Sequence, residues 1–339
     1  MWKRFMVVPI IMLACFLAFT ACGKSSSEVI QWKLATNLPS EGGGPSDWMK
    51  QYAEVVKEKT GGRLVITPYW SETLGKFSDE LNMIQKGICD INYVTVGVHA
   101  AEFPLGTVGD VPFMMPTDRS LPFLNQIFDK YFKKDFKGIH VLFPVWIEGH
   151  DFYTKKKPFK TLSDMKGLQI AVPPSPHFVG VVKALGATPV DIPPSEMYGS
   201  LERGMVDGGM GGISILIAQK FYEQTKYFTV GELDNGFGVV GVNEESWNKL
   251  PDDLKKIIED LNESQQQKFE KIFQDYIKAC ESVLTSAGIT IDRLSPQDKA
   301  KFKAATKPIA DAWEKDMIKK GHPEVADLRK DLAKYNSEK

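Results

Sequence analysis

The chain has 339 residues, of which 43% are hydrophobic and 25% are charged, and its formal net charge at pH 7 is −1. These proportions are typical of a globular protein, and the length is sufficient for two domains with cores of their own. A charge so close to zero provides no electrostatic attraction for nucleic acid, so we expect no partner of that class.

The first 22 residues are predicted to be a lipoprotein signal peptide. Two basic residues, Lys3 and Arg4, precede an apolar run at 5–19, which is shorter than the about twenty residues that span a membrane. The run leads into Cys22, and the preceding Phe-Thr-Ala resembles a lipobox, although Phe stands where Leu is usual. We expect a palmitate-type lipid on Cys22, which would anchor the protein in the periplasm or on the outer face of the cytoplasmic membrane. Plain secretion and an uncleaved anchor are the alternatives.

Residues 23–29 are rich in Ser and Gly and are predicted to form a flexible tether. Alternating patterns then predict strands at 30–35, 63–69 and 91–96. Helical periodicity predicts two helices between these strands, with Ser46 and Ser78 as their N-caps. The order strand, helix, strand, helix, strand indicates a parallel sheet covered by helices.

The same pattern returns in the second half of the chain. Lys86-Gly-Ile-Cys-Asp90 ends the second predicted helix, and Arg203-Gly-Met-Val-Asp207 stands at the equivalent place later. A basic residue, Gly, two apolar residues and Asp in matching element order predict two similarly built α/β lobes. Apolar runs at 140–146 and 236–242 are predicted to be the hinge strands that connect them, with a ligand cleft between.

A long amphipathic stretch at 251–288 follows, with Pro and two Asp at its start. Its length exceeds one lobe of this size unless the helix bends or bridges both lobes. A helix at about 296–320 and a short last helix complete the chain, and we interpret them as scaffold. The predicted units are 30–148 with 237–276 as the first lobe, and 149–236 with 277–339 as the second.

Three segments carry a resemblance that covers nearly the whole mature chain: FKTLSDMKGLQIAVP at 159–173, ALGATPVDIPPSEMYGSLERGMVDG at 184–208, and the start of the long helix at 247–254. The chain resembles the solute-binding receptors of TRAP transporters, in which a receptor delivers its solute to the small and large membrane subunits of a permease. The resemblance implies a two-lobed periplasmic binding protein fold of the Venus-flytrap type, with a long helix spanning both lobes and no enzymatic activity.

The sequence departs from this family at two places. Most members bind organic acids with an Arg in the strand after the Lys-Gly-Leu turn, because a guanidinium donates two parallel hydrogen bonds to a carboxylate. That place is Ala171 here, in the segment that ends at Pro173, and a second usual contact, an Asn, is replaced by Gly211. We therefore expect a ligand that is not a simple organic acid.

Candidate contacts to such a ligand lie around the predicted hinge. Acidic residues and one His end the first hinge strand or precede the second, and would favour a hydroxyl-rich or amine-bearing ligand if they face the cleft. Solvated loop charges are the alternative for most of them. Aromatic residues near the expected cleft loops could stack on a ligand or pack in the core. The candidates are Glu148, His150, Asp151, Glu232 and Asp234, with the aromatic residues Trp70, Phe113, Trp146, Tyr198 and Phe237.

Other kinds of site find little support. The five His show no paired metal-ligand spacing, and no nucleophile motif is present. Gly236-Phe-Gly-Val-Val-Gly241 matches a dinucleotide-binding spacing, but its glycines lie in a predicted strand, so close backbone packing at the hinge is the better interpretation. We expect no metal and no cofactor. Cys89 and Cys280 are interpreted as buried free thiols, with a single disulfide as the alternative.

The leading hypothesis is therefore a monomeric transport receptor for an organic acid, polyol, amine or aromatic compound. A ligand-sensing subunit for a membrane sensor kinase would have the same lobes and is the main alternative. A periplasmic enzyme on the same scaffold is the third class, and would convert its ligand rather than release it unchanged.

Overall fold

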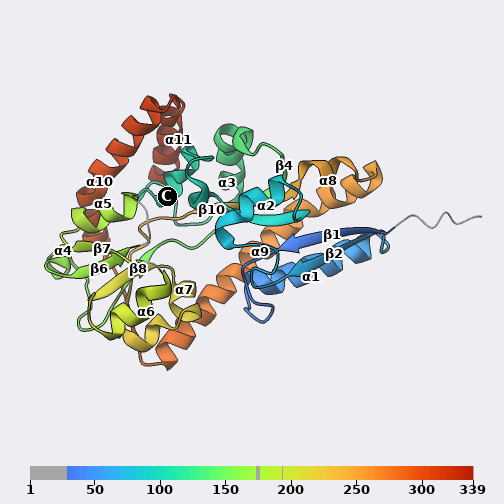
Figure 1. Cartoon of the computed structure of the whole chain (residues 1–339). Helices are drawn as coiled ribbons and strands as arrows, with labels where there is room; N and C mark the ends of the chain where they lie inside the picture. The colour runs from blue at the N-terminus through green and yellow to red at the C-terminus, as the bar shows by residue number, and fades with distance from the viewer. Residues whose placement is uncertain (1–28, 173–175, 193, 339) are drawn as a thin grey trace, which may run out of the picture.

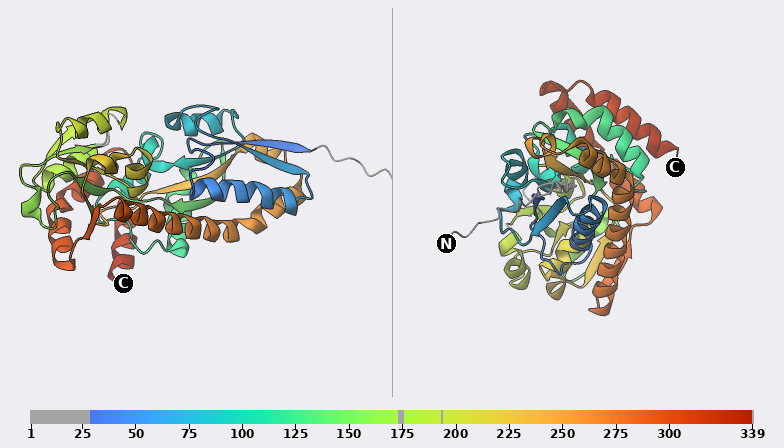
Figure 2. Two further views of the ribbon diagram at one scale, coloured as in Figure 1. Left: turned by 90° about the horizontal axis from the view of Figure 1, so that it is seen from below. Right: turned by 90° about the vertical axis from the view of Figure 1, so that its right-hand side faces the viewer.

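The computed structural model describes residues 29–172, 176–192 and 194–338 (Figure 1). The predicted signal peptide, Cys22, nearly all of the tether and Pro173 lie outside these residues. Two lobes, each built on one sheet, lie at the two ends of the molecule, as the side view in Figure 2 also shows. None of the described helices is long and apolar enough to cross a membrane.

The first lobe contains a five-stranded sheet of order β2-β1-β3-β10-β4. Its strands are β1 (Ile30–Ala35), β2 (Leu64–Tyr69), β3 (Ile91–Thr95), β4 (Ile139–Trp146) and β10 (Phe237–Asn243). Its helices are α1 (Pro45–Lys59), α2 (Glu80–Gln85), α3 (Leu121–Ile127) and α8 (Glu244–Asn248). Short 3-10 or π turns lie at Phe77–Asp79, Val96–His99, Leu105–Asp110, Phe128–Phe132 and Lys133–Asp135.

The second lobe contains a six-stranded sheet of order β11-β9-β5-β8-β6-β7. Its strands are β5 (Asp151–Thr154), β6 (Gln169–Val172), β7 (Thr188–Asp191), β8 (Gly208–Gly211), β9 (Tyr227–Val230) and β11 (Thr290–Arg293). Its helices are α4 (Leu162–Met165), α5 (Pro176–Ala184), α6 (Pro194–Glu202) and α7 (Ile213–Ala218), with a 3-10 turn at Phe221–Gln224.

The internal similarity in the sequence has a direct structural cause. The neighbours β2-β1-β3 and β7-β6-β8 are all parallel and have the same order. In each lobe the Asp of the repeated motif is bound to the backbone of the central strand, because Asp90 accepts a hydrogen bond from the N–H of Lys33 (2.8 Å) and Asp207 accepts one from that of Gln169 (2.9 Å). The two lobes are therefore similarly built, as the sequence predicts.

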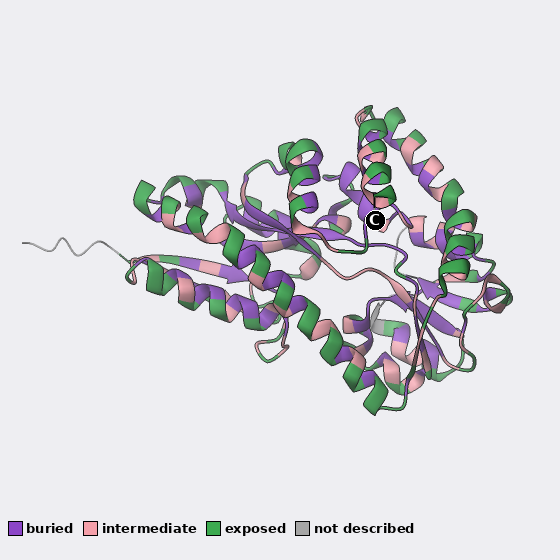
Figure 3. Cartoon of the chain, turned by 180° about the vertical axis from the view of Figure 1, so that it is seen from behind, coloured by how far each residue is buried: buried purple, intermediate pink, exposed green. Residues whose placement is uncertain are grey.

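The long helix α9 (Asp252–Ser286) joins the two lobes. Leu254 and Phe269 pack in a core cluster of the first lobe, whereas Cys280 and Leu284 pack in one of the second. Figure 3 shows its exposed face turned outward along the back of the molecule. The prediction of one helix spanning both lobes is confirmed, and both Cys280 and the similarly buried Cys89 are free thiols.

The C-terminal helices do not lie wholly in the second lobe, to which the predicted boundaries assign them. The start of α10 (Pro296–Lys319) packs in the second lobe through Phe302, but Trp313 and Met317 lie in a core cluster of the first lobe. Helix α11 (Val325–Ser337) joins the same cluster through Leu328. The chain after α9 thus returns to the first lobe, because the apolar face of α10 is long enough to reach both cores.

Two local predictions are wrong. Ser46 lies inside α1, whose N-cap is Gly44, and the Ser46 hydroxyl donates instead to the carbonyl of Pro39 (2.9 Å). Ser78 lies in a 3-10 turn before α2 and caps nothing among the described residues. In both cases the turn before the helix sets the start of the helix, which single-residue preferences do not reveal.

The chain crosses between the sheets at 147–150, directly after the first predicted hinge strand, and at 231–236, directly before the second. Both predicted strands, β4 and β10, pair with each other inside the first sheet. The crossings also touch, since the N–H of Ile147 donates to the carbonyl of Gly236 (3.1 Å). The glycines of β10 serve close packing, because a Cβ on Gly238 would lie 2.7 Å from the carbonyl oxygen of Val94.

Trp146 lies in the core of the first lobe and not against a ligand. Its side chain is fully buried beside Phe237, and its indole N–H has no partner among the described residues. We predict that Trp146→Ala lowers the free energy of unfolding by about 3–5 kcal/mol, measured by chemical denaturation, because it leaves a large cavity. Trp146→Phe should cost much less, since no hydrogen bond is lost. The partly exposed Trp70→Ala is the matched control. Undiminished stability of Trp146→Ala would contradict this placement.

Candidate ligand-binding cleft

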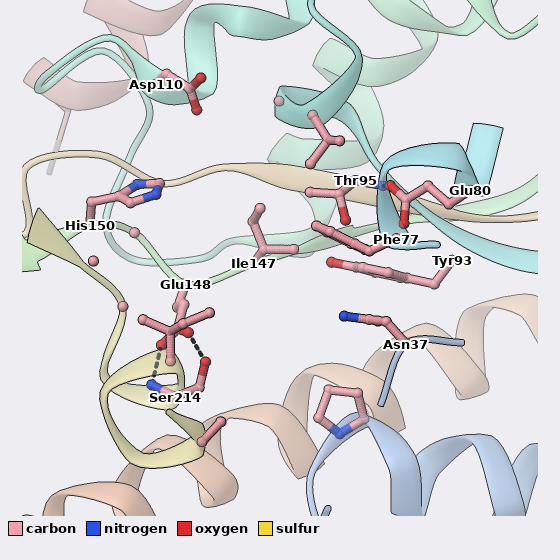
Figure 4. Close-up of a pocket in the computed structure, with 18 of the residues that line it drawn as sticks. Asn37, Phe77, Glu80, Tyr93, Thr95, Asp110, Ile147, Glu148, His150 and Ser214 are labelled. Atoms are coloured by element: carbon pink, nitrogen blue, oxygen red, sulfur yellow. Dashed lines mark hydrogen bonds between the residues drawn. The ribbon is translucent and has the colours of Figure 1, made fainter. Parts of the chain in front are cut away.

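A cavity of about 1150 Å³ lies between the two lobes, large enough for a small organic molecule (Figure 4). Each lobe, the first crossing and α9 contribute side chains to its wall. Those used below are Phe77, Glu80, Tyr93, Thr95 and Asp110 from the first lobe, Ile147, Glu148 and His150 from the first crossing, and Ala171, Gly211, Ser214 and Ile215 from the second lobe.

The structure brings together four of the residues that the sequence singles out as ligand contacts. Glu148, His150, Ala171 and Gly211 all line the cavity. Pro173 lies outside the described residues. Trp70, Asp151, Tyr198, Asp234 and Phe237 are not part of its wall, and neither are the further candidates Phe113, Trp146 and Glu232.

The first five of these candidates have partners of their own. The ring of Trp70 lies 5.9 Å from the ammonium of Lys50, and Phe237 is buried in the core of the first lobe. The hydroxyl of Tyr198 donates to Glu223 (2.8 Å) on the side of the second lobe. The carboxylate of Asp151 accepts the backbone N–H groups of residues 231 and 232, and Asp234 lies behind His150.

Ala171 and Gly211 leave the second-lobe wall without polar side chains at the two places where the family resemblance expects Arg and Asn. A Cβ on Gly211 would lie 3.2 Å from the Cγ2 atom of Ile215, so a larger residue there would need Ile215 to move. No arginine lines the cavity among the described residues. Arg119, behind the first crossing, is engaged by Glu270 of α9 and by the carbonyl of Ile147 (2.9 Å).

Glu148 points into the cavity from the first crossing and is held by the second lobe. Its carboxylate accepts hydrogen bonds from the backbone N–H of Ser214 (3.1 Å) and from the Ser214 hydroxyl (Figure 4). Burial raises the pKa of Glu148, and the two Ser214 donors oppose this effect. The carboxylate therefore remains in need of a further donor or positive charge.

Glu80 is a second carboxylate in the same cavity, at the start of α2. Its residue is only 4% exposed, and it accepts the backbone N–H of Thr95 (2.5 Å) and lies 3.4 Å from Nε2 of His99. Burial raises its pKa. Sequence reasoning missed Glu80, because an acidic residue in the first turn of a helix is an ordinary helix signal and conceals any second role.

Asp110 and His150 form a charged group at the far end of the cavity. Burial raises the pKa of Asp110 to about 6, and the charge of Asp234 adds to this effect while that of His150 opposes it. Burial lowers the pKa of His150, but the carboxylates of Asp234, Asp110 and Glu148 outweigh it, so that the pKa rises to about 9. Sequence reasoning also missed Asp110, which lies in a turn without a motif.

Aromatic rings lie among these charges. Tyr93 and Phe77 project into the cavity between Glu80 and Glu148 (Figure 4). Tyr93 is fixed by stacking on Phe269 of α9, with ring centroids 6.0 Å apart. Carboxylates beside aromatic faces form an environment that attracts cations.

Two α/β lobes around a cavity that contacts both of them define an extracytoplasmic solute receptor. A family model described as bacterial extracellular solute-binding protein, family 7, matches residues 46–316. The chain belongs to this family, whose members bind solutes and are not enzymes, so the prediction that it is not an enzyme is confirmed.

Known proteins of this kind are similar over most of the chain. The 2,3-diketo-L-gulonate-binding periplasmic protein YiaO of Escherichia coli is 25% identical over 289 residues, covering 83% of this chain and 85% of YiaO. The ectoine/5-hydroxyectoine-binding periplasmic protein UehA of Ruegeria pomeroyi is 26% identical over 220 residues, covering 62% and 63%. The crystal structure of a TRAP periplasmic solute binding protein from Ochrobactrum anthropi superposes with a TM-score of 0.81 at 25% identity, covering 92% and 98%. The resemblance to TRAP solute receptors is thereby confirmed.

Buried titratable groups in and beside the cleft predict how stability depends on pH. A group whose pKa is raised by folding stabilises the fold at low pH and loses this contribution as pH rises through the folded value. The pH at which this contribution is lost is set by the folded pKa, which is about 6 for Asp110, about 7 for Asp151 and about 9 for His150. We therefore predict that the melting temperature of the ligand-free protein falls between about pH 4 and pH 9.

Asp110→Asn should flatten the lower part of this dependence, between about pH 4 and pH 6, because the neutral side chain has no proton to lose. The exposed Asp79→Asn is the matched control and should leave the slope unchanged. A melting temperature that rises across the same range would contradict the assigned burial of these groups.

Proposed function

We propose that this protein is the receptor of a TRAP-type transporter whose cleft takes a small solute with a positive charge or several hydroxyl groups, and that it delivers this solute to the small and large membrane subunits of a permease. The supporting observation is that Glu80, Glu148 and Asp110 converge on one cavity whose described wall contains no arginine. The similarity to TRAP receptors favours transport over a sensing role.

The charge balance of the cavity argues for this class of solute. An ionised carboxylate only accepts hydrogen bonds, so each of these residues needs a donor from the ligand. The raised pKa values of Glu80 and Glu148 indicate that the protein alone does not compensate their burial. An ammonium or hydroxyl group supplies the missing donors, and the faces of Tyr93 and Phe77 add to the attraction for a cation.

The same balance disfavours a free organic acid. Without an arginine at position 171, a ligand carboxylate would lie near like charges and would lack a bidentate donor. Lys320, the C-cap of α10, is the lysine in the described wall, and it is paired with Asp316 (2.7 Å), which also lines the cavity. The proposed solute therefore differs from the acid that gives YiaO its name.

Ligand binding would couple to lobe closure because the carboxylates belong to different parts of the molecule. Glu80 is fixed to the first lobe through Thr95, whereas Glu148 is bound to the second lobe through Ser214. A ligand can shift the balance between open and closed forms only through contacts that improve on closure. A cation held between the two carboxylates meets this requirement.

A thermal-shift screen of organic acids, polyols, amines and aromatic compounds tests the proposed solute class. We predict that amines or polyols raise the melting temperature by mass action and that simple acids do not. Glu148→Gln should weaken the best solute about tenfold or more, or about 1.4 kcal/mol, measured by calorimetric titration. Glu202→Gln, at an exposed position of the second lobe, is the matched control.

Ala171→Arg provides the reciprocal variant. A guanidinium in this cavity should remove affinity for cations, because it would pair with the carboxylates that are proposed to bind them. Stabilisation of the unmodified protein by simple carboxylates alone would disprove the proposed solute class, and unchanged cation affinity in Ala171→Arg would mean that residue 171 does not face the solute.

We further propose that Cys22 carries the lipid that holds the receptor at the membrane surface. Cys22→Ser should move the protein from the membrane fraction to the soluble periplasmic fraction, and the N-terminal peptide should lose its acyl mass in mass spectrometry. An unchanged distribution between the two fractions would exclude the anchor.

A further inference from the structure

Asp234 lies directly behind His150 at the point where the two crossings meet. Its side chain is 1% exposed, and its Oδ1 atom accepts the backbone N–H of His150 (2.9 Å) and lies 3.1 Å from Nδ1 of the same residue. Because an ionised carboxylate can only accept, Nδ1 carries a proton and donates it to Asp234. The tautomer and the orientation of the ring are therefore set by one buried side chain.

The other ring nitrogen of His150, Nε2, is available to a ligand in the cavity. The side chain of His150 remains 26% exposed and lines the cavity wall, and Figure 4 shows its ring extending into that space. Among the described residues Nε2 has no hydrogen-bond partner, so the protonation of Nε2 decides whether the cleft offers a donor or an acceptor at this place.

The groups around the ring favour the charged form. Asp234 from the second crossing, Asp110 from the turn at Leu105–Asp110 and Glu148 from the first crossing all raise the pKa of His150. Helix α5 contributes the ring of Phe178, with centroids 4.2 Å apart, and His177, whose pKa is lowered by burial so that it adds no charge near pH 7. The charged groups that act most strongly on the pKa of His150 are therefore carboxylates, whereas the cation Lys320 in the same cavity wall is paired with Asp316.

We propose that Asp234 is a positioning residue that holds His150 as an imidazolium with its Nε2–H directed into the cleft, where it selects an uncharged oxygen acceptor on the ligand. This inference rests on the proposed function, because it describes the second end of the same solute. The carboxylates bind the positive charge or hydroxyl donors, and His150 donates to a hydroxyl, carbonyl or ether oxygen a short distance away.

The acceptor is uncharged for an electrostatic reason. Asp234 already neutralises the imidazolium, and Asp110 and Glu148 leave an excess of negative charge beside it. A ligand carboxylate at this place would face that excess, whereas a neutral oxygen accepts the Nε2–H without repulsion. The solute predicted by both ends of the cleft is thus a cation with an uncharged oxygen.

Nitrogen-15 NMR of the histidines in the ligand-free protein tests the protonation directly. In the natural protein, His150 should carry protons on both nitrogens at neutral pH and should lose the Nε2 proton near pH 9. In Asp234→Asn the amide oxygen still accepts both hydrogen bonds, so Nδ1 should stay protonated while Nε2 titrates near the ordinary value of about 6.5. Titration of His150 at or below that value in the natural protein would overturn the inference, even if Asp234→Asn does not fold.

Calorimetric titration with two amines that differ in one group tests the selectivity. 3-Amino-1-propanol and n-butylamine have the same chain length, and only the first carries an oxygen. At about pH 8 the natural protein should prefer the amino alcohol about tenfold or more, because n-butylamine leaves the Nε2–H unpaired. Asp234→Asn should lose this preference at the same pH, since its Nε2 is then a lone-pair acceptor, and should regain it at about pH 5.5.

The two proposals fail in different ways. Equal affinity of both amines in the natural protein would overturn the selection by His150 and leave the proposed cationic class intact. If neither amine binds and carboxylates bind instead, the proposed solute class is disproved. The NMR titration would still decide whether Asp234 holds an imidazolium. If Asp234 had only a structural role, Asp234→Asn would lower the stability of the protein but would not change the pH at which His150 titrates.

Discussion

The cleft depends on several carboxylates that are buried around the place where the chain crosses between lobes. Removing a carboxylate from water costs free energy unless donors replace the lost hydration. The protein supplies part of the replacement, through Ser214 for Glu148, Thr95 for Glu80 and His150 for Asp234. The uncompensated part raises the pKa values of Glu80 and Glu148 and is available to a ligand that brings positive charge or hydrogen-bond donors.

The crossings are also tied to the long helix, which links the cleft to the whole molecule. Arg119 donates to the carboxylate of Glu270 on α9 and to the carbonyl of Ile147, and its guanidinium lies 5.1 Å from the ring centroid of Phe273. These contacts fix the first crossing to α9 on the side away from His150. The closure proposed above would therefore move whole lobes rather than a loop, because these contacts already order the first crossing.

Much of the fold is predictable from local patterns, because the repeated Asp90 and Asp207 accept the equivalent backbone hydrogen bond from the central strand in both lobes. The return of α10 to the first lobe was not predictable, since the periodicity that places Trp313 on an apolar face does not say which core it enters. In the site, Glu148 and His150 follow a strand and were found for that reason. Asp234 was found as a candidate, but its direction is set by hydrogen bonds across the two crossings, which no spacing in the sequence records.

The alanine at position 171 and the acidic groups of the cavity act together on its charge under the proposed function. An arginine at position 171, in a cavity that already contains Glu80, Glu148 and Asp110, would pair with the protein's own carboxylates and leave little charge for an organic acid. Conversely, Ala171 without those carboxylates would leave an apolar wall and no charge to select a solute. Under the proposed function, residue 171 and the carboxylates of the cavity therefore select the class of ligand jointly.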